Sequence, residues 1–376
     1  MSRPTLLIIA FSPIHEDARV LKQVRLFTTH YDVTTVGYGP APDGVVAHHE
    51  IPAQLVAWRK GRRALILRRY AEVQRTNAVL AHLRAVLPVG AYDVVLANDA
   101  DTVPLALSLR PRAGVHVDLH EYAPRENEES WRWRLFVAPY YRWLCREFVA
   151  KAASVSTVGQ GLADEYRREF GIHASVVPNA TPFHDLRPTP VHAAVRLVHS
   201  GNARRNRDLG LMIEAVRLTR ADVTLDLFLM PNDPGYLAEV REQAAGVPGV
   251  TVHDPVPYAD LIRTLNDYDI GVFVLPPVTF NYEWTLPNKF FDYVQARLGI
   301  IVGPSPEMAA LVREHELGAV TEAFDPSSVA RALENLDPQM IRDWKRASNA
   351  VASDLAADHQ VSAWESALAR LTGSSQ

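Results

Sequence analysis

Short apolar segments rich in β-branched residues alternate with amphipathic segments along almost the whole chain, and this alternation limits the possible folds most strongly. In the first half the expected strands are TLLIIA (5–10), DVTTVG (32–37), DVVLAN (93–98), VHVDLH (115–120), SVSTV (154–158) and ASVVPN (174–179). In the second half they are VRLVHSG (195–201), LDLFLM (225–230), VTVHD (250–254), DIGVFVLP (269–276) and GIIVG (299–303). Strands that alternate with helices in this way form parallel sheets covered by helices on both faces.

Helical periodicity fills the intervals between these strands. The expected helices lie near 17–29, 62–86, 131–150, 161–169, 208–218, 235–245, 258–266, 287–296, 307–314, 326–335, 338–353 and 360–371. The segment TPFHDLRPTPVHAA (181–194) has three prolines and no periodicity, which is typical of a linker. We therefore expect two doubly wound α/β domains, 1–185 and 186–355, with a ligand cleft at the carboxyl ends of both sheets.

The last residues, 356–376, are expected to return to the first domain. Val361, Trp364, Leu368 and Leu371 are spaced three or four apart and form one apolar stripe on a helix. Such a stripe is buried against another element, and we expect that element to belong to the first domain.

Composition excludes several classes of protein. The 376 residues are 48% hydrophobic and 22% charged, with a formal net charge of −4, so no overall positive field favours nucleic acid. The single cysteine, Cys145, excludes an internal disulfide framework. Apolar runs are shorter than the ~18 residues of a membrane helix, and TLLIIAF is too short for the core of a signal peptide. We expect a cytoplasmic protein.

Other enzymes built from α/β domains lack their motifs here. A dinucleotide-binding dehydrogenase needs G-x-G-x-x-G between a strand and a helix, and the nearest match, GYGPAPDG (37–44), has the wrong spacing. The sequence contains no P-loop and no G-x-S-x-G elbow. No cluster of histidines, cysteines or carboxylates has the spacing of metal ligands, so we expect no metal and no cofactor.

The segment VRLVHSGNARRNRDLGLMIEAV (195–216) has the pattern of an anion site. A strand leads into Ser200 and Gly201, and a loop with Arg204, Arg205 and Arg207 precedes a helix expected to begin near Asp208. Backbone N–H groups at a helix start, with guanidinium groups beside them, suit a diphosphate. The alternative is a solvated basic loop.

Polar residues follow the strands of the first half. Asn98, Asp99 and Asp101 come after one strand, His120 and Glu121 after another, and His15 and Asp17 after the first. Because the carboxyl ends of parallel strands share one edge, these residues are expected to face the cleft, where His120 would touch a ligand. A lone histidine is more often structural, and this alternative stays open.

The segment TLPNKFFDYVQAR (285–297) is an amphipathic helix with an unusual polar face. With Pro287 at the first helical position, Lys289, Asp292 and Ala296 share one face while Phe290 and Phe291 share the other. The simplest interpretation is an i,i+3 ion pair on a solvated helix.

Seven segments in order resemble those of the retaining nucleotide-sugar glycosyltransferases with the GT-B fold, the group 1 or family 4-like glycosyltransferases. They are DARVLKQVRLF, NDADTVP, DLHEYAP, VVPNATP, SGNARRNRDLGLMIEAV, NYEWTLPNKFFDYVQAR and GPSPEMAALVREHELGAV. The resemblance covers nearly the whole chain. It implies two Rossmann-like domains, a nucleoside-diphosphate-sugar donor bound by the second domain, and a hydroxyl acceptor bound by the first.

The resemblance also assigns site residues. It implies that Asp292 accepts both ribose hydroxyls, and that Arg207 lies on the phosphates. The arginine that relatives carry directly after the loop glycine falls on Asn202 here, so Arg204 or Arg205 is expected to compensate. The glutamate that contacts the donor sugar in relatives falls on Trp284, and Asn281, Tyr282 and Glu283 are expected to replace it. Lys289 either approaches the phosphates or pairs with Asp292.

The expected reaction is metal-independent, hexosyltransferase-type transfer with retention. The expected catalytic residues are His120, Arg207 and Arg204. The expected donor-binding residues are Ser200, Gly201, Asn202, Arg205, Asn281, Tyr282, Glu283, Lys289 and Asp292, and those on the acceptor side are His15, Asp17, Asp99 and Glu121. Two alternatives stay open: a nucleotide-sugar epimerase or hydrolase on the same fold, and a degenerate module that binds a nucleotide or a glycan without transfer.

The sequence does not identify the acceptor, which could be a saccharide, a lipid-linked glycan or a small molecule. WRKGRRALILRRY (58–70) and WRWRLFVAPYYRWLCREF (131–148) mix aromatic and basic residues. Such mixtures suit the anionic cytosolic face of a membrane, although aromatics at helical spacing are more often core residues. Peripheral membrane contact through these segments is therefore a hypothesis, and nucleic acid is not an expected partner.

Overall fold

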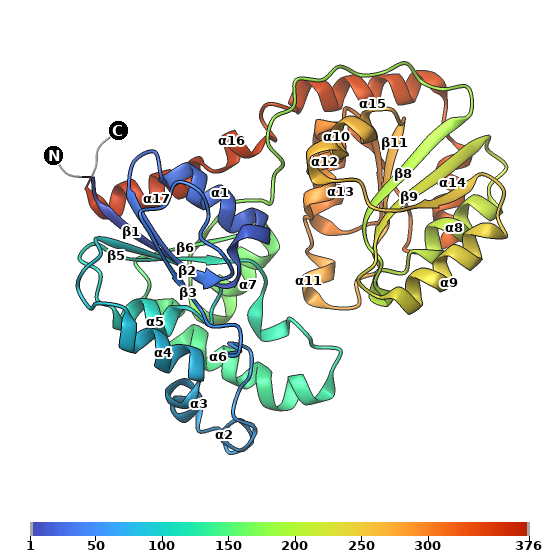
Figure 1. The fold of residues 1–376 in the computed structure, drawn as a ribbon. Coiled ribbons are helices and arrows are strands. Elements are labelled where there is room, and N and C mark those ends of the chain that lie inside the picture. The colour runs from blue at the N-terminus through green and yellow to red at the C-terminus, as the bar shows by residue number, and fades with distance from the viewer. Residues whose placement is uncertain (1–2, 374–376) are drawn as a thin grey trace. The chain divides into compact units, whose positions relative to one another are not determined.

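The computed structural model describes residues 3–373 and divides into two compact units (Figure 1). The first unit holds the chain up to Val177, the short segment Thr279–Asn281 and the chain from Val361 on. The second unit holds Pro178–Val278 and Tyr282–Gln360. The expected domain boundaries were after residues 185 and 355, and the observed ones are after 177 and 360. The first boundary lies earlier than expected because the linker packs on the second unit.

A seven-stranded parallel sheet forms the middle of the first unit, in the order β3-β2-β1-β4-β5-β6-β7. Its strands are β1 (Thr5–Pro13), β2 (Asp32–Tyr38), β3 (Ala47–Glu50), β4 (Val94–Asn98), β5 (Gly114–Leu119), β6 (Ser154–Thr157) and β7 (Ala174–Val176). The sequence did not indicate β3, a short edge strand whose residues are only partly buried or exposed.

Helices cover this sheet and form its connections. They are α1 (Ala18–Phe27), α2 (Arg62–Ile66), α3 (Tyr70–Thr76), α4 (Ala78–Val86), α5 (Val103–Ser108), α6 (Ala138–Glu147), α7 (Gln160–Phe170) and α17 (Ser362–Thr372). Short helical turns are η1 (Ile14–Glu16), η2 (Ala123–Arg125), η3 (Trp133–Val137) and η4 (Val149–Lys151).

Of two long helices expected in the first half, one is broken in the structure and the other contains a π-helical turn. The segment 62–86 forms α2, α3 and α4, because Arg68 adopts a positive φ of 54° and Asn77 caps α4 by accepting from the N–H groups of Val79 and Leu80. The segment 131–150 begins with a π-helical turn, η3, before α6. Periodicity alone predicted the apolar faces here but not the breaks.

The second unit repeats the architecture with a six-stranded parallel sheet in the order β10-β9-β8-β11-β12-β13. Its strands are β8 (Val195–Asn202), β9 (Val223–Met230), β10 (Val250–His253), β11 (Ile270–Phe273), β12 (Gly299–Val302) and β13 (Gly318–Val320). Its helices are α8 (Gly210–Leu218), α9 (Pro234–Ala245), α10 (Tyr258–Asn266), α12 (Asn288–Gln295), α13 (Pro306–Glu314), α14 (Pro326–Glu334), α15 (Pro338–Val351) and α16 (Ala357–Gln360), with the turn η5 (Arg205–Arg207). The short helix α11 (Phe280–Glu283) begins in the segment of the first unit and ends in the second unit.

The C-terminal helix α17 belongs to the core of the first unit. Trp364 and Leu368 are buried with Leu6 and Ile8 of β1, and α17 contacts β4 and β5. Val361 and Leu371 pack against the same core, so the apolar stripe of the helix is buried along its length.

Helix α12 begins one residue later than expected, with Pro287 as the N-cap and Asn288 as the first helical residue. The other end of α12 has an arginine where helices commonly have a glycine. Arg297 adopts the positive φ (61°) that a C-terminal glycine usually supplies, and its guanidinium donates to the carbonyls of Gln295 (2.6 Å) and His184 (2.7 Å). The arginine thus satisfies a carbonyl at the helix end and ties the linker to α12.

In each sheet the strand order reverses at one point, between β1 and β4 in the first unit and between β8 and β11 in the second. Ligands of doubly wound folds bind beyond the carboxyl ends of the strands at this point. The candidate site residues follow β1, β4 and β5 in the first unit and β8 and β11 in the second, so the topology brings them to the expected edges.

Candidate functional site

A cavity of about 680 Å³ lies at the carboxyl end of β8 in the second unit. Five of the residues expected to bind the donor line it, namely Ser200, Gly201, Asn202, Lys289 and Asp292, together with Arg207, which was expected to be catalytic. The rest of the lining is mainly apolar, with Phe228, Met230, Pro255, Val256, Pro257, Tyr258, Leu261 and Pro287, together with Asn288. Apolar walls with a few convergent polar groups are typical of a small-molecule site.

Arg207 is the arginine of the basic loop that lines this cavity. Its guanidinium lies 4.9 Å from the centre of the Tyr282 ring. Its Nε is buried and has no hydrogen-bond partner among the described residues. A buried donor without a partner is costly, and an anion in the cavity would satisfy it.

The other two arginines of the loop do not line this cavity. Arg205 points to α9, where it pairs with both carboxylate oxygens of Glu239 (2.7 and 2.8 Å) and lies over the ring of Tyr236. Arg204 is exposed. Neither is therefore placed to replace the charge that position 202 lacks.

Lys289 contacts the strand end rather than only its own helix. Its Nζ lies 3.4 Å from Nε2 of His199 and 4.4 Å from the centre of the Phe273 ring. Burial, and then the charge of Arg207, lower the pKa of Lys289 to about 7, although Asp292 acts in the opposite direction. The solvated i,i+3 ion pair is thus not the environment of this lysine.

Asp292 is 4% exposed and lies at the inner wall of the same cavity. Its Oδ1 accepts a hydrogen bond from the hydroxyl of Thr181 (2.5 Å), a buried linker residue. The backbone carbonyl of Thr181 in turn accepts from the N–H of Ala357 (2.9 Å). The linker therefore orients this carboxylate, which the sequence did not indicate.

The residues expected to replace the missing glutamate lie elsewhere. Asn281 is engaged with the backbone of Tyr122, accepting from its N–H (2.8 Å) and donating to its carbonyl (3.3 Å). Tyr282 supports Arg207, and Glu283 is exposed at the end of α11. None of the three lines the cavity of the second unit.

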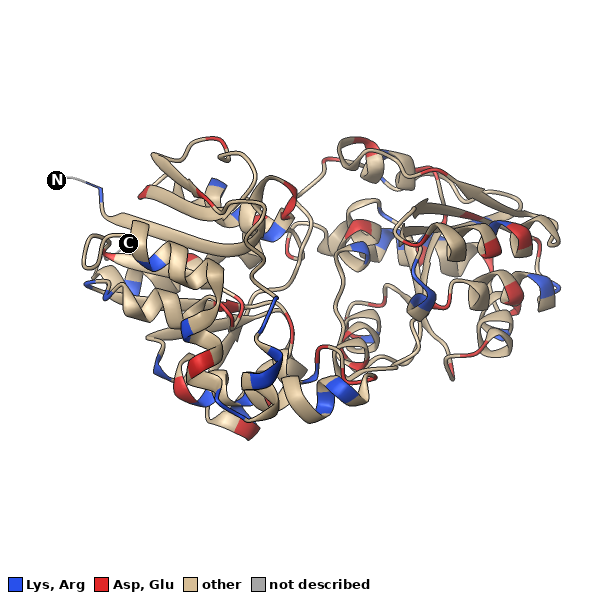
Figure 2. Cartoon of the chain, turned by 60° about the horizontal axis from the view of Figure 1, so that its bottom comes forward, with Lys and Arg blue, Asp and Glu red and all other residues tan. Residues whose placement is uncertain are grey.

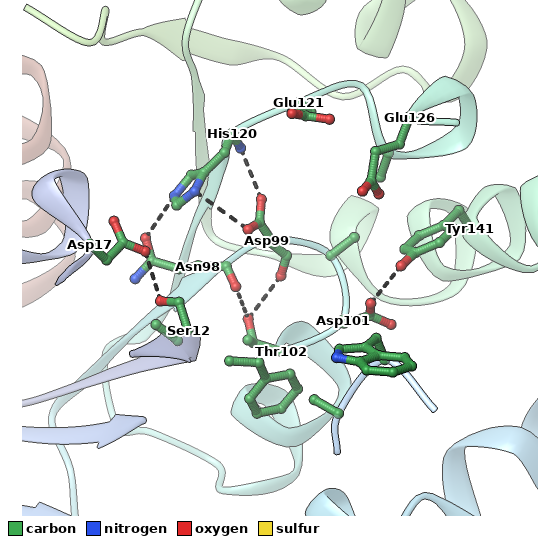
Figure 3. A pocket seen from close by; sticks show the side chains of 16 residues that line it. Ser12, Asp17, Asn98, Asp99, Asp101, Thr102, His120, Glu121, Glu126 and Tyr141 are labelled. Carbon is green, nitrogen blue, oxygen red and sulfur yellow. Dashed lines mark hydrogen bonds and ion pairs between the residues drawn. The ribbon is translucent and has the colours of Figure 1, made fainter. Parts of the chain in front are cut away.

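A second cavity, of about 360 Å³, lies at the carboxyl ends of β1, β4 and β5 in the first unit (Figure 3). Asp17, Asp99, His120 and Glu121, four of the residues expected there, line it. His15 does not line this cavity. It packs against Gly39 so closely that a Cβ added to this glycine would lie 2.6 Å from the imidazole. Asp17 caps α1, accepting from the N–H groups of Arg19 and Val20.

His120 is held by oxygen atoms on two sides (Figure 3). Its Nδ1 lies 3.4 Å from Oδ2 of Asp99, and its Nε2 lies 3.1 Å from Oδ1 of Asn98 and 3.4 Å from Oδ2 of Asp118. Burial lowers the pKa of His120, but the two carboxylates outweigh it and raise the pKa above its ordinary value. This favours an imidazolium that donates hydrogen bonds.

Asp118 is the centre of the network behind His120. It is fully buried and accepts two hydrogen bonds from the guanidinium of Arg19 (2.7 and 2.8 Å) and one from Gln23 (2.8 Å). Trp364 of α17 donates to its Oδ1 (3.3 Å). Arg19 holds the pKa of Asp118 well below its usual range despite burial, so the carboxylate stays ionised.

Sequence reasoning missed Asp118, Thr181 and His199. The first and the last had a signal, because each is a polar residue near the carboxyl end of an expected strand, VHVDLH and VRLVHSG. Thr181 had none, since only the folded linker brings it to Asp292.

The remaining wall of the first cavity combines acidic and aromatic groups. Asp101 accepts from Tyr141 (2.6 Å) and from Lys60 (3.2 Å), and the ring of Trp58 lies at the same cavity. Carboxylates can accept hydrogen bonds from sugar hydroxyls, and aromatic rings can cover the apolar faces of a sugar. Among residues 3–373 no group of three or more His, Cys, Asp or Glu is placed to hold a metal ion.

Comparison with known families matches residues 194–337 to the glycosyl transferases group 1. No curated protein sequence matches the chain. The matched range contains the whole cavity of the second unit, from Ser200 to Asp292.

Solved structures match over the full length. A glycosyltransferase from Rickettsia africae has a TM-score of 0.70 at 11% identity, with 100% of both chains covered. HepE from Anabaena, in complex with UDP-glucose, has a TM-score of 0.71 at 12% identity, covering 97% of this chain and 99% of that one. Sucrose-phosphate synthase from Thermosynechococcus elongatus has a TM-score of 0.70 at 12% identity, covering 99% and 100%. The predicted resemblance is confirmed: the chain has the GT-B fold, and its residues 194–337 match the group 1 glycosyltransferases.

Proposed function

We propose that the protein transfers a sugar from a nucleoside-diphosphate sugar to an acceptor hydroxyl, with retention of configuration and without a metal cofactor. The observation that carries the proposal is the cavity of the second unit, where Arg207 and Lys289 meet the end of β8 and Asp292 is buried at the wall. Cations beside a strand end suit a diphosphate, and a carboxylate suits vicinal ribose hydroxyls.

In the proposed reaction the acceptor oxygen bonds to the anomeric carbon while the bond from that carbon to the β-phosphate oxygen breaks. The departing phosphate takes the acceptor proton, and Arg207 stabilises its growing negative charge. His120 donates a hydrogen bond to the donor sugar and is not a nucleophile. The residues of the first cavity, Asp99 and Glu121 among them, belong to the acceptor side. Retention and the role of His120 rest on the resemblance.

We propose UDP as the first nucleotide to test, because HepE was solved with UDP-glucose. A thermal-shift panel of UDP, GDP, ADP and dTDP should show one nucleotide that raises the melting temperature of the wild-type protein. The same shift should be smaller in Arg207→Met and unchanged in Arg217→Met, whose arginine pairs with Glu214 on the surface of α8. If no nucleotide shifts the melting temperature, the proposal is wrong.

Incubation with the matching sugar donor separates the remaining alternatives. A transferase releases the nucleoside diphosphate faster when acceptor is present, and the new bond has the configuration of the donor. An epimerase or hydrolase would consume the donor without an acceptor. A binding module would bind the nucleotide and leave the donor intact.

We also propose that the first unit contacts an anionic membrane surface. Five large apolar side chains are more than half exposed around α2 and η3, which contact each other: Trp58 (76%), Ile66 (57%), Leu67 (64%), Trp131 (59%) and Leu135 (52%). Arginines close to them in sequence are also exposed: Arg59, Arg62, Arg63, Arg68, Arg132 and Arg134. Figure 2 shows basic residues on the short helices of this unit. Exposed apolar side chains together with exposed arginines favour an anionic bilayer, each charge contributing about 1 kcal/mol.

Vesicle sedimentation tests the membrane contact. The protein should bind vesicles with phosphatidylglycerol and not those of pure phosphatidylcholine, and salt should weaken the binding. The double variant Trp58→Ser/Trp131→Ser should bind less, whereas Val89→Ser, at an exposed valine elsewhere in the unit, should bind normally. Equal binding by both variants would contradict this proposal. No helix among residues 3–373 is long and apolar enough to cross a membrane.

A further inference from the structure

Lys289 and Gly201 form a matched pair at the end of β8. A Cβ built on Gly201 would lie 2.4 Å from Nζ of Lys289, so the ammonium lies directly against the strand end. Gly201 also has a φ of +152°, which side-chain-bearing residues rarely adopt. The next residue, Asn202, occupies the position where relatives carry an arginine. A cation from α12 is therefore present beside the position that lacks one.

The amine of Lys289 contacts the neutral imidazole of His199. Its Nδ1 lies 2.9 Å from the carbonyl of Val272 and so carries the proton, which leaves the lone pair of Nε2 facing Lys289. The Phe273 ring stacks on His199 and lies beneath the same ammonium. Burial, and then the charge of Lys289, lower the pKa of His199 well below its ordinary value, so the histidine stays neutral.

The hydrogen-bond partner of Lys289 is the neutral His199, and its charged neighbours Arg207 and Asp292 have opposite effects on its pKa. The charged or titratable groups that face it are His199 on β8, Arg207 on η5 and Asp292 on α12. Burial and Arg207 favour the neutral amine, and the pKa of about 7 reflects this balance. A diphosphate between Lys289 and Arg207 would reverse the balance, because it brings negative charge to the cavity that both residues line.

We propose that Lys289 is the second cation of the diphosphate site, in place of the arginine missing at position 202, and that it takes up a proton when the diphosphate binds. This inference rests on the proposed function, because it assigns a linked proton to the same nucleotide site. Binding of the nucleoside diphosphate then depends on the fraction of Lys289 that is already protonated.

Calorimetric titration at pH 8 tests the proposal, with UDP or the member of GDP, ADP and dTDP that the thermal-shift panel selects. At this pH the terminal phosphate is already ionised, since its second pKa is about 6. Titrations in Tris and in HEPES buffer, which have different ionisation enthalpies and contain no phosphate, give the number of protons taken up. Wild type should take up nearly one proton per nucleotide, and its affinity should fall almost tenfold between pH 7.5 and 8.5.

Two variants separate the proton from other effects. Lys289→Met should bind more weakly at pH 7 and take up no proton, and its affinity should approach that of wild type as the pH rises. Lys289→Arg keeps a permanent cation and should bind without proton uptake. Arg217→Met is the matched control and should behave as wild type. Melting of each variant without nucleotide confirms that it folds.

Two outcomes overturn the proposal while leaving the proposed function intact. One is binding of the nucleotide by wild type with no proton uptake and no change in affinity between pH 7.5 and 8.5. The other is equal proton uptake by wild type and Lys289→Met, which would assign the proton to another group. If none of the four nucleotides binds the wild-type protein, the proposed function itself fails.

Discussion

At the scale of single residues, the candidate nucleotide site depends on neighbours that hold its charged groups. Thr181 orients Asp292, Tyr282 lies against the guanidinium of Arg207, and His199 contacts the amine of Lys289. Each of these neighbours comes from a different segment of the second unit. Substitution of a charged group and of its neighbour should therefore affect the same measurement to different extents.

Asp292→Ala should weaken nucleoside diphosphate binding about 100-fold. The reason is the loss of two charge-assisted hydrogen bonds to the ribose, together worth ~3 kcal/mol. Because the ribose does not change during transfer, the KM for the donor should rise more than kcat falls. Thr181→Val, which removes only the orienting hydroxyl, should have a smaller effect in the same direction. Tight binding by Asp292→Ala would show that the carboxylate has no role in the site.

Arg207→Ala should lower turnover of the donor by a factor on the order of 100, because it removes a charge contact that strengthens as the diphosphate departs. Arg207→Lys should recover part of the loss, since it restores the charge without the planar guanidinium. Steady-state release of the nucleoside diphosphate measures both. Normal turnover in Arg207→Ala would mean that another group neutralises the leaving phosphate.

At the scale of elements, strand β5 buries a histidine, His116, against two serines of β6, and this makes the stability of the first unit depend on pH. His116 is fully buried between the hydroxyls of Ser154 (2.8 Å) and Ser156 (3.0 Å). Burial lowers its pKa to about 4 from an ordinary value of 6.5. The unfolded chain therefore binds a proton more readily than the folded one between these values.

Acid should therefore destabilise the folded protein, because protonation of His116 favours the unfolded chain. The contribution of neutral His116 to stability is complete above pH 6.5 and is lost as the pH falls toward 4, by about 3 kcal/mol in all. His116→Gln should lack this part of the pH dependence. Urea unfolding of both proteins at pH 7.5, 6 and 5 gives the comparison. Parallel curves would show that His116 does not titrate as its burial requires.

The same elements show how far a sequence of this kind can be interpreted. Each of the expected strands is present, because short apolar runs between amphipathic helices form the buried strands of a parallel sheet. The missed strands β3 and β13 are edge strands of four and three residues without fully buried residues, which is too short for a recognisable apolar run. The break of 62–86 into three helices depends on the conformation of Arg68 and on a cap, which periodicity does not indicate.

For the site, the sequence predicted charges better than contacts. Ser200, Gly201, Asn202, Arg207, Lys289 and Asp292 line one cavity, because the loop after β8 and the start of α12 adjoin it. Arg205 was expected at the phosphates but pairs with Glu239 of α9, a partner 34 residues away in sequence. Such partners depend on packing between elements and leave no local pattern.

At the scale of the whole molecule, the C-terminal helix completes the unit that the N-terminus begins. Trp364 is buried, its indole N–H bonds Asp118 and Ser156, and Arg19 lies over its ring at 4.7 Å. The helix thus supports both the core of the first unit and the network behind His120.

Removal of residues 358–376 should therefore destabilise the first unit strongly. Loss of Trp364 alone is expected to cost about 3–5 kcal/mol, the usual range for a buried tryptophan replaced by alanine. Trp364→Ala, a milder change than the deletion, should also lower the melting temperature. Equal melting of the deletion variant and the full chain would contradict this role of α17.

The most direct test of the account is titration of the selected nucleoside diphosphate into wild type, Asp292→Ala, Arg207→Met and the control Arg217→Met. The central claim is that the second unit alone supplies the nucleotide site at the end of β8. It predicts that wild type and the control bind equally, and that both site variants bind at least tenfold more weakly while melting normally without nucleotide. Equal affinity in all four proteins would contradict the claim and place the nucleotide elsewhere.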